Sequence, residues 1–271
     1  AEEGAPEGEK GGAPLMLEEG VFDIVKPEAV FGLHVFSTLN TGKIGYRSGP
    51  FMAAADRFRI LVKGEQTHGS RPWSGIDPIV ASAQIVMGLQ TLVSRQIDIS
   101  AHPAVVSVGA IKGGIRNNII PDQVEMIGTF RTFDPAVRQQ IIDGITRTAK
   151  DIASSSGATA EVEIAADANP VTFNDVKLTE RMLPSLERAA GPGNVVELPF
   201  VTGAEDFSFF GQRVPSLFFF VGITPPGKDA TKAPSAPTGT LMVCSVQPAS
   251  LPSSATELAA TETLTDFPAP P

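Results

Sequence analysis

One stretch decides the fold: RFRILVK at residues 57–63, followed by DPIVASAQIVMGLQTLV at residues 77–93. The first segment alternates polar and apolar side chains, which predicts a strand with one buried face. The second opens with Asp77-Pro78, the residue types preferred at the N-cap and first position of a helix. Its apolar residues are spaced for one helical face: Ile79, Ile85, Val86, Leu89, Leu92 and Val93.

The next seventy residues complete a unit of known type. Two predicted strands, Ala104 to Ala110 and Val124 to Phe133, are separated by glycine and proline. A second cap, Asp134-Pro135, predicts the start of a helix. The segment from Ala160 to Ile164 alternates apolar and polar residues, which predicts a final strand. The apolar face of that helix is Val137, Ile141, Ile145, Ala149 and Ile152. The order β-α-β-β-α-β is typical of a ferredoxin-like fold, so we expect one over residues 55–166.

Strand and helix patterns flank this unit on both sides. Before it, strands are predicted at Ala29 to Val35, Ile44 to Tyr46 and Phe51 to Ala55. After it come a helix from Asp175 to Ala190 and strands at Val195 to Leu198 and Leu217 to Ile223. We therefore predict one α/β domain, formed by residues 1–54 and 167–232, that is interrupted by the inserted unit.

Composition limits the partners. The 271 residues carry a net charge of −9, and no stretch is densely basic, which argues against binding to a nucleic acid backbone. No apolar run reaches the length of a transmembrane helix, so no membrane partner is expected. The single cysteine, Cys244, excludes an internal disulfide and a cysteine-based metal cage, and the compartment stays open.

The last segment, residues 233–271, differs from the rest. It contains no Lys or Arg and is rich in Pro, Ser, Thr and Ala. Such a segment buries too little apolar surface to offset its conformational entropy, so we predict a disordered tail.

Few side chains are candidates for chemistry. His34 in its apolar strand is either a core histidine or a ligand, and His68 belongs either to an ordinary surface loop or to a site. His102 precedes Pro103, as a turn residue would. Glu2-Glu3 is either a solvated pair or a metal ligand beside a general base, because a hydrolytic metal needs both.

Six motifs, in order, resemble the family of hippurate hydrolase, indole-acetyl-amino-acid hydrolase and aminoacylase. They match from residue 1 to about residue 235: Ala1-Glu2-Glu3-Gly4, Phe31-Gly32-Leu33-His34-Val35, Thr67-His68-Gly69-Ser70-Arg71-Pro72, Gly113 to Pro121, Gly128-Thr129-Phe130-Arg131 and Gly203-Ala204-Glu205-Asp206-Phe207. The resemblance implies a metallopeptidase-like catalytic domain, here partial, with a ferredoxin-like dimerisation lid inserted at 55–166. It implies hydrolysis of the amide bond of N-acyl amino acids such as hippurate.

The resemblance also assigns roles residue by residue. It implies that Glu2 is the general base, that Glu3 and His34 are metal ligands, and that His68 stabilises the oxyanion across a homodimer. It further implies that Asn118, Arg131 and Gly203 bind the free carboxylate of the substrate, the arginine through two parallel hydrogen bonds. The implied metal is zinc, or another divalent ion such as manganese or cobalt.

This sequence departs from the family at two places. The family's first metal motif precedes the Glu-Glu pair, and its last histidine ligand follows Ala233-Pro234-Ser235, where this chain reads Ala236-Pro237. We therefore expect an incomplete metal site, no hydrolysis by this chain alone at an enzymatic rate, and an altered reading frame from about residue 236. The alternative functions are a non-catalytic remnant that keeps the dimerising lid and, disfavoured by the acidic charge, an RNA-binding protein.

Overall fold

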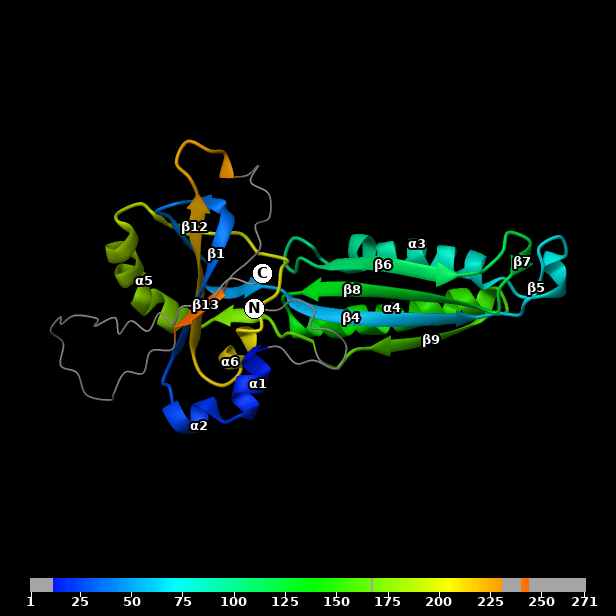
Figure 1. The fold of residues 1–271 in the computed structure, drawn as a ribbon, viewed down its shortest axis with the longest axis horizontal. Coiled ribbons are helices and arrows are strands. Elements are labelled where there is room, and N and C mark those ends of the chain that lie inside the picture. The colour runs from blue at the N-terminus through cyan, green and yellow to red at the C-terminus, as the bar shows by residue number, and fades with distance from the viewer. Residues whose placement is uncertain (1–11, 167, 231–239, 244–271) are drawn as a thin grey trace, which may run out of the picture.

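A computed structural model of the chain describes residues 12–166, 168–230 and 240–243. Two sheets lie side by side in an elongated molecule, with a mixed sheet at one end and an antiparallel sheet extending from it (Figure 1). Among the helices of the described ranges, none is long and apolar enough to cross a membrane.

The first sheet is mixed and has the strand order β11-β2-β12-β1-β13. Its strands are β1 (Val30–Asn40), β2 (Ile44–Tyr46), β11 (Val195–Glu197), β12 (Ser216–Thr224) and β13 (Thr240–Val243). The central pair, β1 and β12, is parallel and brings the segments before and after the inserted unit into register. One sheet therefore contains strands from both flanks.

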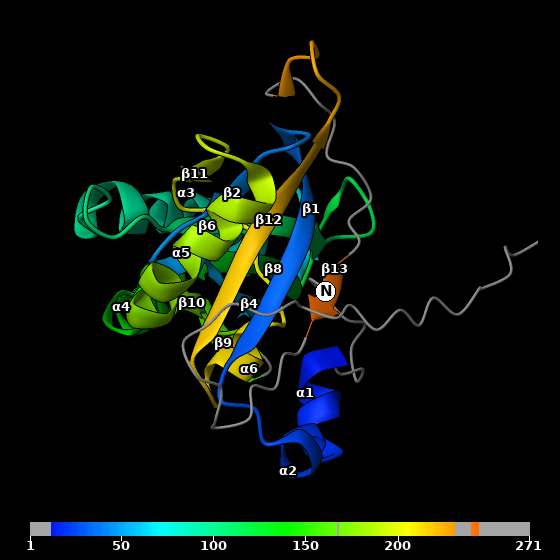
Figure 2. The same ribbon diagram turned by 90° about the vertical axis from the view of Figure 1, so that its left-hand side faces the viewer.

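Alternate residues of β12 point to opposite faces of this sheet, and each face has its own core. Leu217 packs with Leu178 and Leu186 of α5 (Val176–Ala190), which lies across the sheet in Figure 2. The next residue, Phe218, packs on the other face with Phe207. Three short helices lie on that side: α1 (Gly12–Glu18), α2 (Val21–Val25) and α6 (Ser208–Gly211).

A short ribbon connects the two sheets. It pairs β3 (Gly49–Met52) with β10 (Thr172–Asn174). The Ala53 N–H bonds both the Val201 and the Gly203 carbonyl oxygens at 3.0 Å, and the chain then enters the second sheet.

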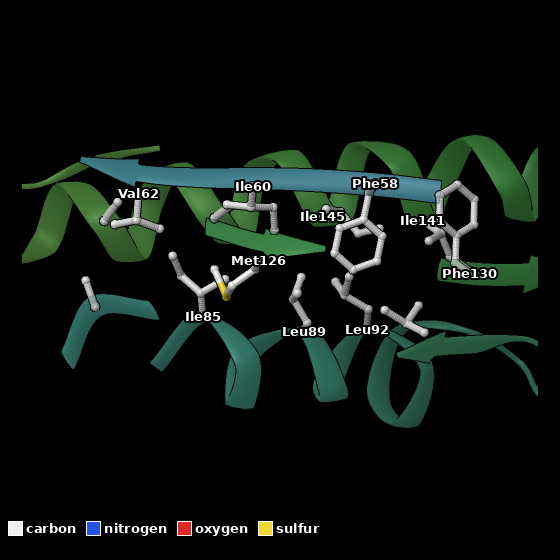
Figure 3. Close-up of a cluster of buried hydrophobic side chains, with 14 of the residues drawn as sticks. Phe58, Ile60, Val62, Ile85, Leu89, Leu92, Met126, Phe130, Ile141 and Ile145 are labelled. Atoms are coloured by element: carbon white, nitrogen blue, oxygen red, sulfur yellow. The ribbon is translucent and has the colours of Figure 1, made fainter. Parts of the chain in front are cut away.

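The second sheet is fully antiparallel, with the strand order β6-β8-β4-β9. Its elements follow each other in the chain as β4 (Ala54–Lys63), α3 (Pro78–Gln96), β6 (Val105–Gly113), β8 (Gln123–Thr132), α4 (Pro135–Ser155) and β9 (Thr159–Ile164). Both helices cover one face, where Phe58 and Ile60 of β4 meet Leu89 of α3 and Ile145 of α4 (Figure 3). The β-α-β-β-α-β order predicted from the sequence is the observed one.

The two predicted helix caps are confirmed. The Asp77 carboxylate accepts the N–H groups of Ile79 and Val80, and the Asp134 carboxylate accepts those of Ala136 and Val137. Both helices therefore begin at the proline after the aspartate.

The far end of the second sheet carries a small tip. It consists of β5 (Thr67–His68), which pairs with β7 (Ile119–Ile120), and of a 3-10 turn at Pro72–Ser74. Figure 1 shows β5 and β7 at the end of the molecule away from β1.

Three predictions need correction. The strand predicted at Phe51 to Ala55 is divided at Ala53, whose N–H turns to the 201–203 loop. Ile79 is 43% exposed, because it lies at the flank of the helix face that is buried through Pro78, Ala81 and Ile85. Thr240–Val243, within the segment predicted to be a disordered tail, forms a strand, because this β-prone stretch pairs with the backbone of β1. The rest of that segment lies outside the described residues.

Candidate functional site

His34 lies on β1 in the interior of the first sheet. Its side chain is 5% exposed, and its ring meets the edge of Phe220 at a centroid distance of 5.9 Å. Phe220 belongs to the buried core of this face, so its contact sets one side of the His34 ring against apolar atoms. The histidine is therefore held in a defined orientation.

Both ring nitrogens of His34 face oxygen atoms. Nδ1 lies 2.6 Å from the Val35 carbonyl oxygen, and Nε2 lies 3.4 Å from Glu205 Oε1. Burial lowers the pKa of the His34 imidazole below its usual value, and the hydrogen bond to Val35 opposes this only in part. A neutral imidazole with one nitrogen bound to a carbonyl oxygen has the state that a metal ligand requires.

Glu205 is the residue that sequence reasoning missed. It lies in the loop before α6 and is 2% exposed. The quoted motif Gly203-Ala204-Glu205-Asp206-Phe207 contained it, but no role was assigned to it. The available signal was a pair of acidic residues between small residues and a phenylalanine-rich helix, which is an unusual place for solvated carboxylates.

Gly203 and Arg131 lie at the junction of the two sheets. The Gly203 carbonyl oxygen accepts the Ala53 N–H, and Arg131 is the strand partner of Ala55. Both candidates for substrate binding therefore adjoin the segment Ala53–Ala55 in space, at the end of β4 nearest the first sheet.

His68 and Asn118 lie together at the tip. The Gly69 N–H donates to the Asn118 carbonyl oxygen at 2.8 Å, and a Cβ on Gly69 would lie 3.3 Å from that oxygen. The exposed His68 ring accepts the Ser70 N–H at Nδ1, at 3.1 Å. In a neutral imidazole with this partner, the remaining N–H is on Nε2, which is then a donor.

The candidate residues thus form two groups at opposite ends of the second sheet. Strand β8 runs from Gln123 near the tip to Arg131 near the first sheet, and its 10 residues span about 30 Å. Asn118 and Arg131, predicted to hold the same carboxylate, are separated by this length. One chain therefore cannot bring the tip residues to His34.

The remaining candidates are placed as follows. His102 is exposed in a turn, where its N–H bonds the Asp98 carbonyl oxygen at 2.9 Å, as the sequence indicated. Glu2 and Glu3 lie outside the described residues. Within residues 12–166, 168–230 and 240–243, no group of three or more His, Cys, Asp or Glu could hold a metal ion. His34 and Glu205 offer an imidazole and a carboxylate, which are donor types that zinc accepts.

A buried imidazole beside a carboxylate on a mixed α/β sheet supplies donor types that metal-dependent hydrolases use. The model of Peptidase family M20/M25/M40 matches residues 1–242, and the chain belongs to this family. The resemblance to the amidohydrolases of this kind is thereby confirmed.

Named relatives have hydrolytic activities. The chain is 41% identical over 216 residues to thermostable carboxypeptidase 2 of Saccharolobus solfataricus, covering 80% of this chain and 53% of that protein. It is 39% identical over 216 residues to an N-acetylcysteine deacetylase of Bacillus subtilis, covering 78% and 54%. Because these relatives are enzymes, the alternative of a non-catalytic remnant is not favoured.

A solved structure of an M20 peptidase is also similar to this chain. The Bacillus subtilis YXEP protein, described as a dinuclear metal-binding peptidase of the M20 family, matches with a TM-score of 0.63 and 35% identity over 78% of this chain and 51% of that one. The chain spans about half the length of the relatives it matches.

Proposed function

We propose that these residues belong to a metal-dependent amidohydrolase that cleaves the amide bond of N-acyl amino acids of the hippurate kind. The observation that carries the proposal is the buried His34 beside Glu205, at the end of the molecule where Arg131 and Gly203 also lie. The similarity to an N-acetylcysteine deacetylase supports the reaction type.

Arg131 and Gly203 suggest how a substrate is oriented. A guanidinium binds a carboxylate through two parallel hydrogen bonds, so Arg131 would hold the free carboxylate of the amino acid moiety. The Gly203 N–H is the second candidate for the same group. This would place the scissile amide toward His34.

A second substrate class has support of its own. Relatives named carboxypeptidases are 41% and 40% identical to this chain. A carboxypeptidase also cleaves an amide bond next to a free carboxylate, so the same anchor would serve a peptide. Comparing N-acyl amino acids with dipeptides as substrates distinguishes the two.

The proposed metal is zinc, or manganese or cobalt, with Glu3 and His34 among its ligands. A divalent ion at such a site supplies Lewis-acid activation of the water and the carbonyl group. Glu2 would accept the proton of the attacking water, because a carboxylate adjacent to a ligand residue can lie within hydrogen-bond reach of it.

His68 would act in the site of a second copy of the chain. With Nδ1 bound by the Ser70 N–H, its Nε2–H would donate to the oxyanion that forms during amide cleavage. Because about 30 Å of strand separates the tip from His34 in one chain, this role requires a homodimer. Asn118 would come from the same second copy.

We assign residues 55–166 to an inserted ferredoxin-like lid, flanked by catalytic segments at 1–54 and 167–232. The strand order β6-β8-β4-β9 and a core of its own support this division. We expect residues 55–166, expressed alone, to fold, because both helices have an apolar face and a cap. The measurement is far-UV circular dichroism with thermal melting; a random-coil spectrum would refute the assignment.

The outward face of α3 is the proposed dimer contact. Between Pro78 and Ser94 this helix carries no charged residue, and Val80 and Met87 are 54% and 70% exposed. Helix α4, on the same side of the sheet, instead exposes charged residues such as Asp143, Arg147 and Lys150. An exposed face without charge next to a charged one favours association.

Placing a charge on this face should therefore break the dimer. We expect the 271-residue chain to sediment as a dimer at tens of micromolar and Met87→Glu to sediment as a monomer, because the new carboxylate would be buried without a partner. Gln139→Glu on exposed α4 is the matched control and should leave the dimer intact. A wild-type monomer, or equal behaviour of the two variants, would contradict the interface.

Hydrolysis is tested in a completed chain: residues 1–235 flanked by the N- and C-terminal segments of the Bacillus subtilis N-acetylcysteine deacetylase. We expect metal-dependent release of the amino acid from N-acetyl or N-benzoyl amino acids, lost on chelation and restored by zinc, manganese or cobalt. A folded, metal-loaded completed chain without hydrolysis of N-acyl amino acids or dipeptides would refute the proposed function.

A further inference from the structure

The face of the second sheet that its helices leave uncovered carries a cavity. Its volume is about 420 Å³, within the range of about 300–1,000 Å³ that is typical of small-molecule sites. Phe58 and Ile60 of β4 pack under the helices (Figure 3). Arg59 and Leu61 alternate with them, so they point to the opposite face, where they line the cavity. The dimer contact proposed on α3 lies on the helix side and would leave this cavity open.

One part of the cavity lining is an ion-pair network. The Arg59 Nε lies 2.5 Å from Glu125 Oε1 on β8, and its Nη1 lies 3.4 Å from Glu163 Oε1 on β9. The two carboxylates compensate the charge of Arg59, so this network joins three strands without requiring a ligand. Leu61 and Pro121 add apolar surface to the lining.

Two other charged residues of the lining have no such partner. Lys112 of β6 lies opposite Glu125 in the strand register, but Glu125 is bound to Arg59. Within the part of the chain that the structure describes, no ion pair or side-chain hydrogen bond joins Lys112 or Asp122 to another residue. The cavity therefore presents a cation and an anion that are not paired with each other.

The positions of Lys112 and Asp122 set the length of a ligand that contacts both. Asp122 precedes Glu125, the strand partner of Lys112, by three residues, which corresponds to about 10 Å of strand. An extended dipeptide is about 7 Å long and leaves room at each end for one of these side chains, whereas a single amino acid is half as long. Gln66 and Gln123, also in the lining, supply amide donors and acceptors for a peptide group.

We propose that this cavity binds a short zwitterionic peptide of dipeptide length. Its terminal carboxylate would be bound by Lys112, its terminal ammonium group by Asp122, and an apolar side chain would pack on Leu61 and Pro121. Contacts of this kind between charged groups are about twice as strong as neutral hydrogen bonds. The cavity lies near the tip of the second sheet, away from Arg131, and the inference does not depend on the proposed hydrolysis.

The test is peptide binding by the 271-residue chain, measured by isothermal titration with a chelator present. The probe is alanyl-leucine, and two matched probes each lack one charge: N-acetyl-alanyl-leucine has no ammonium group, and alanyl-leucinamide has no carboxylate. We expect saturable binding of alanyl-leucine at one site per chain. Each matched probe should bind at least about tenfold more weakly, because it loses one charge-assisted contact. Free leucine, which is too short for both contacts, should also bind more weakly.

Matched variants connect this binding to the cavity. Lys112→Met and Asp122→Asn should each weaken the binding of alanyl-leucine at least about tenfold. Lys150→Met and Asp151→Asn on α4 remove the same charges on the helix side of the sheet and should bind as the wild type does. All four residues are exposed, so thermal melting should be the same in every variant.

Three results would overturn the inference: no binding by the wild type, equal binding of a matched probe or of free leucine, and unchanged binding by Lys112→Met. If Arg131→Gln loses the binding that Lys112→Met keeps, the peptide occupies the proposed substrate site. That outcome would overturn the cavity and leave the proposed function.

Discussion

In the completed chain, His68→Ala is expected to lower kcat about 10²- to 10³-fold, equivalent to about 2.7–4 kcal/mol in the barrier. The Nε2–H would stabilise the oxyanion more strongly in the transition state than it stabilises the carbonyl of the bound substrate, so kcat should fall more than KM changes. Steady-state kinetics with an N-acyl amino acid measures both constants.

Folding should be unaffected by this change, because His68 is exposed and its ring bonds to Ser70 of the same loop. His102→Ala, in another exposed turn, is the control and should retain full activity. A drop in kcat of less than about fivefold in His68→Ala would count against the oxyanion role.

Glu2→Ala in the completed chain is expected to remove hydrolysis while the metal stays bound. Loss of a positioned general base costs about 10²- to 10⁴-fold in rate. His34→Ala is the matched comparison and should lose metal and hydrolysis together, because His34 is a proposed ligand. Metal content and kcat are measured on the same samples.

Two other outcomes for Glu2→Ala would change the role assigned to Glu2. If Glu2→Ala loses the metal as His34→Ala does, Glu2 is a ligand and not the base. If Glu2→Ala keeps full activity, Glu2 is not the base, and the pair Glu2-Glu3 is solvated, as most glutamates in proteins are.

Local chemistry predicted much of the second sheet. Asp77-Pro78 and Asp134-Pro135 marked the helix starts, because a cap depends on residues two and three positions away in the sequence. Alternation at residues 57–63 marked β4, in which buried and half-buried positions alternate. Ile79 was misassigned because helical periodicity does not give the width of the buried face, and Ile79 lies at its flank beside the buried Pro78.

The site was less accessible from the sequence, because its contacts join distant segments. Glu205 and His34 meet only because β1 and the loop before α6 adjoin in the folded chain, and neither residue has a local pattern that predicts this contact. The strand β13 depends similarly on the free side of β1, and a composition rich in Pro and Ser around Thr240–Val243 concealed it.

The separation of His68 from His34 is of a different kind. Sequence motifs predicted both residues, and the length of β8 then separates His68 at the tip of the second sheet from His34 on β1 of the first sheet. The central claim is therefore that the active site combines His34 of one copy with His68 and Asn118 of another.

Mixed dimers test this claim most directly. Completed chains carrying His34→Ala and His68→Ala are co-expressed with different tags, and the heterodimer is isolated by two affinity steps. If the two histidines act across the dimer, one of the two sites in each heterodimer is intact, and activity should reach about half that of the wild-type dimer. Activity no higher than that of the two parent homodimers would show that the site lies within one chain, and would contradict the account.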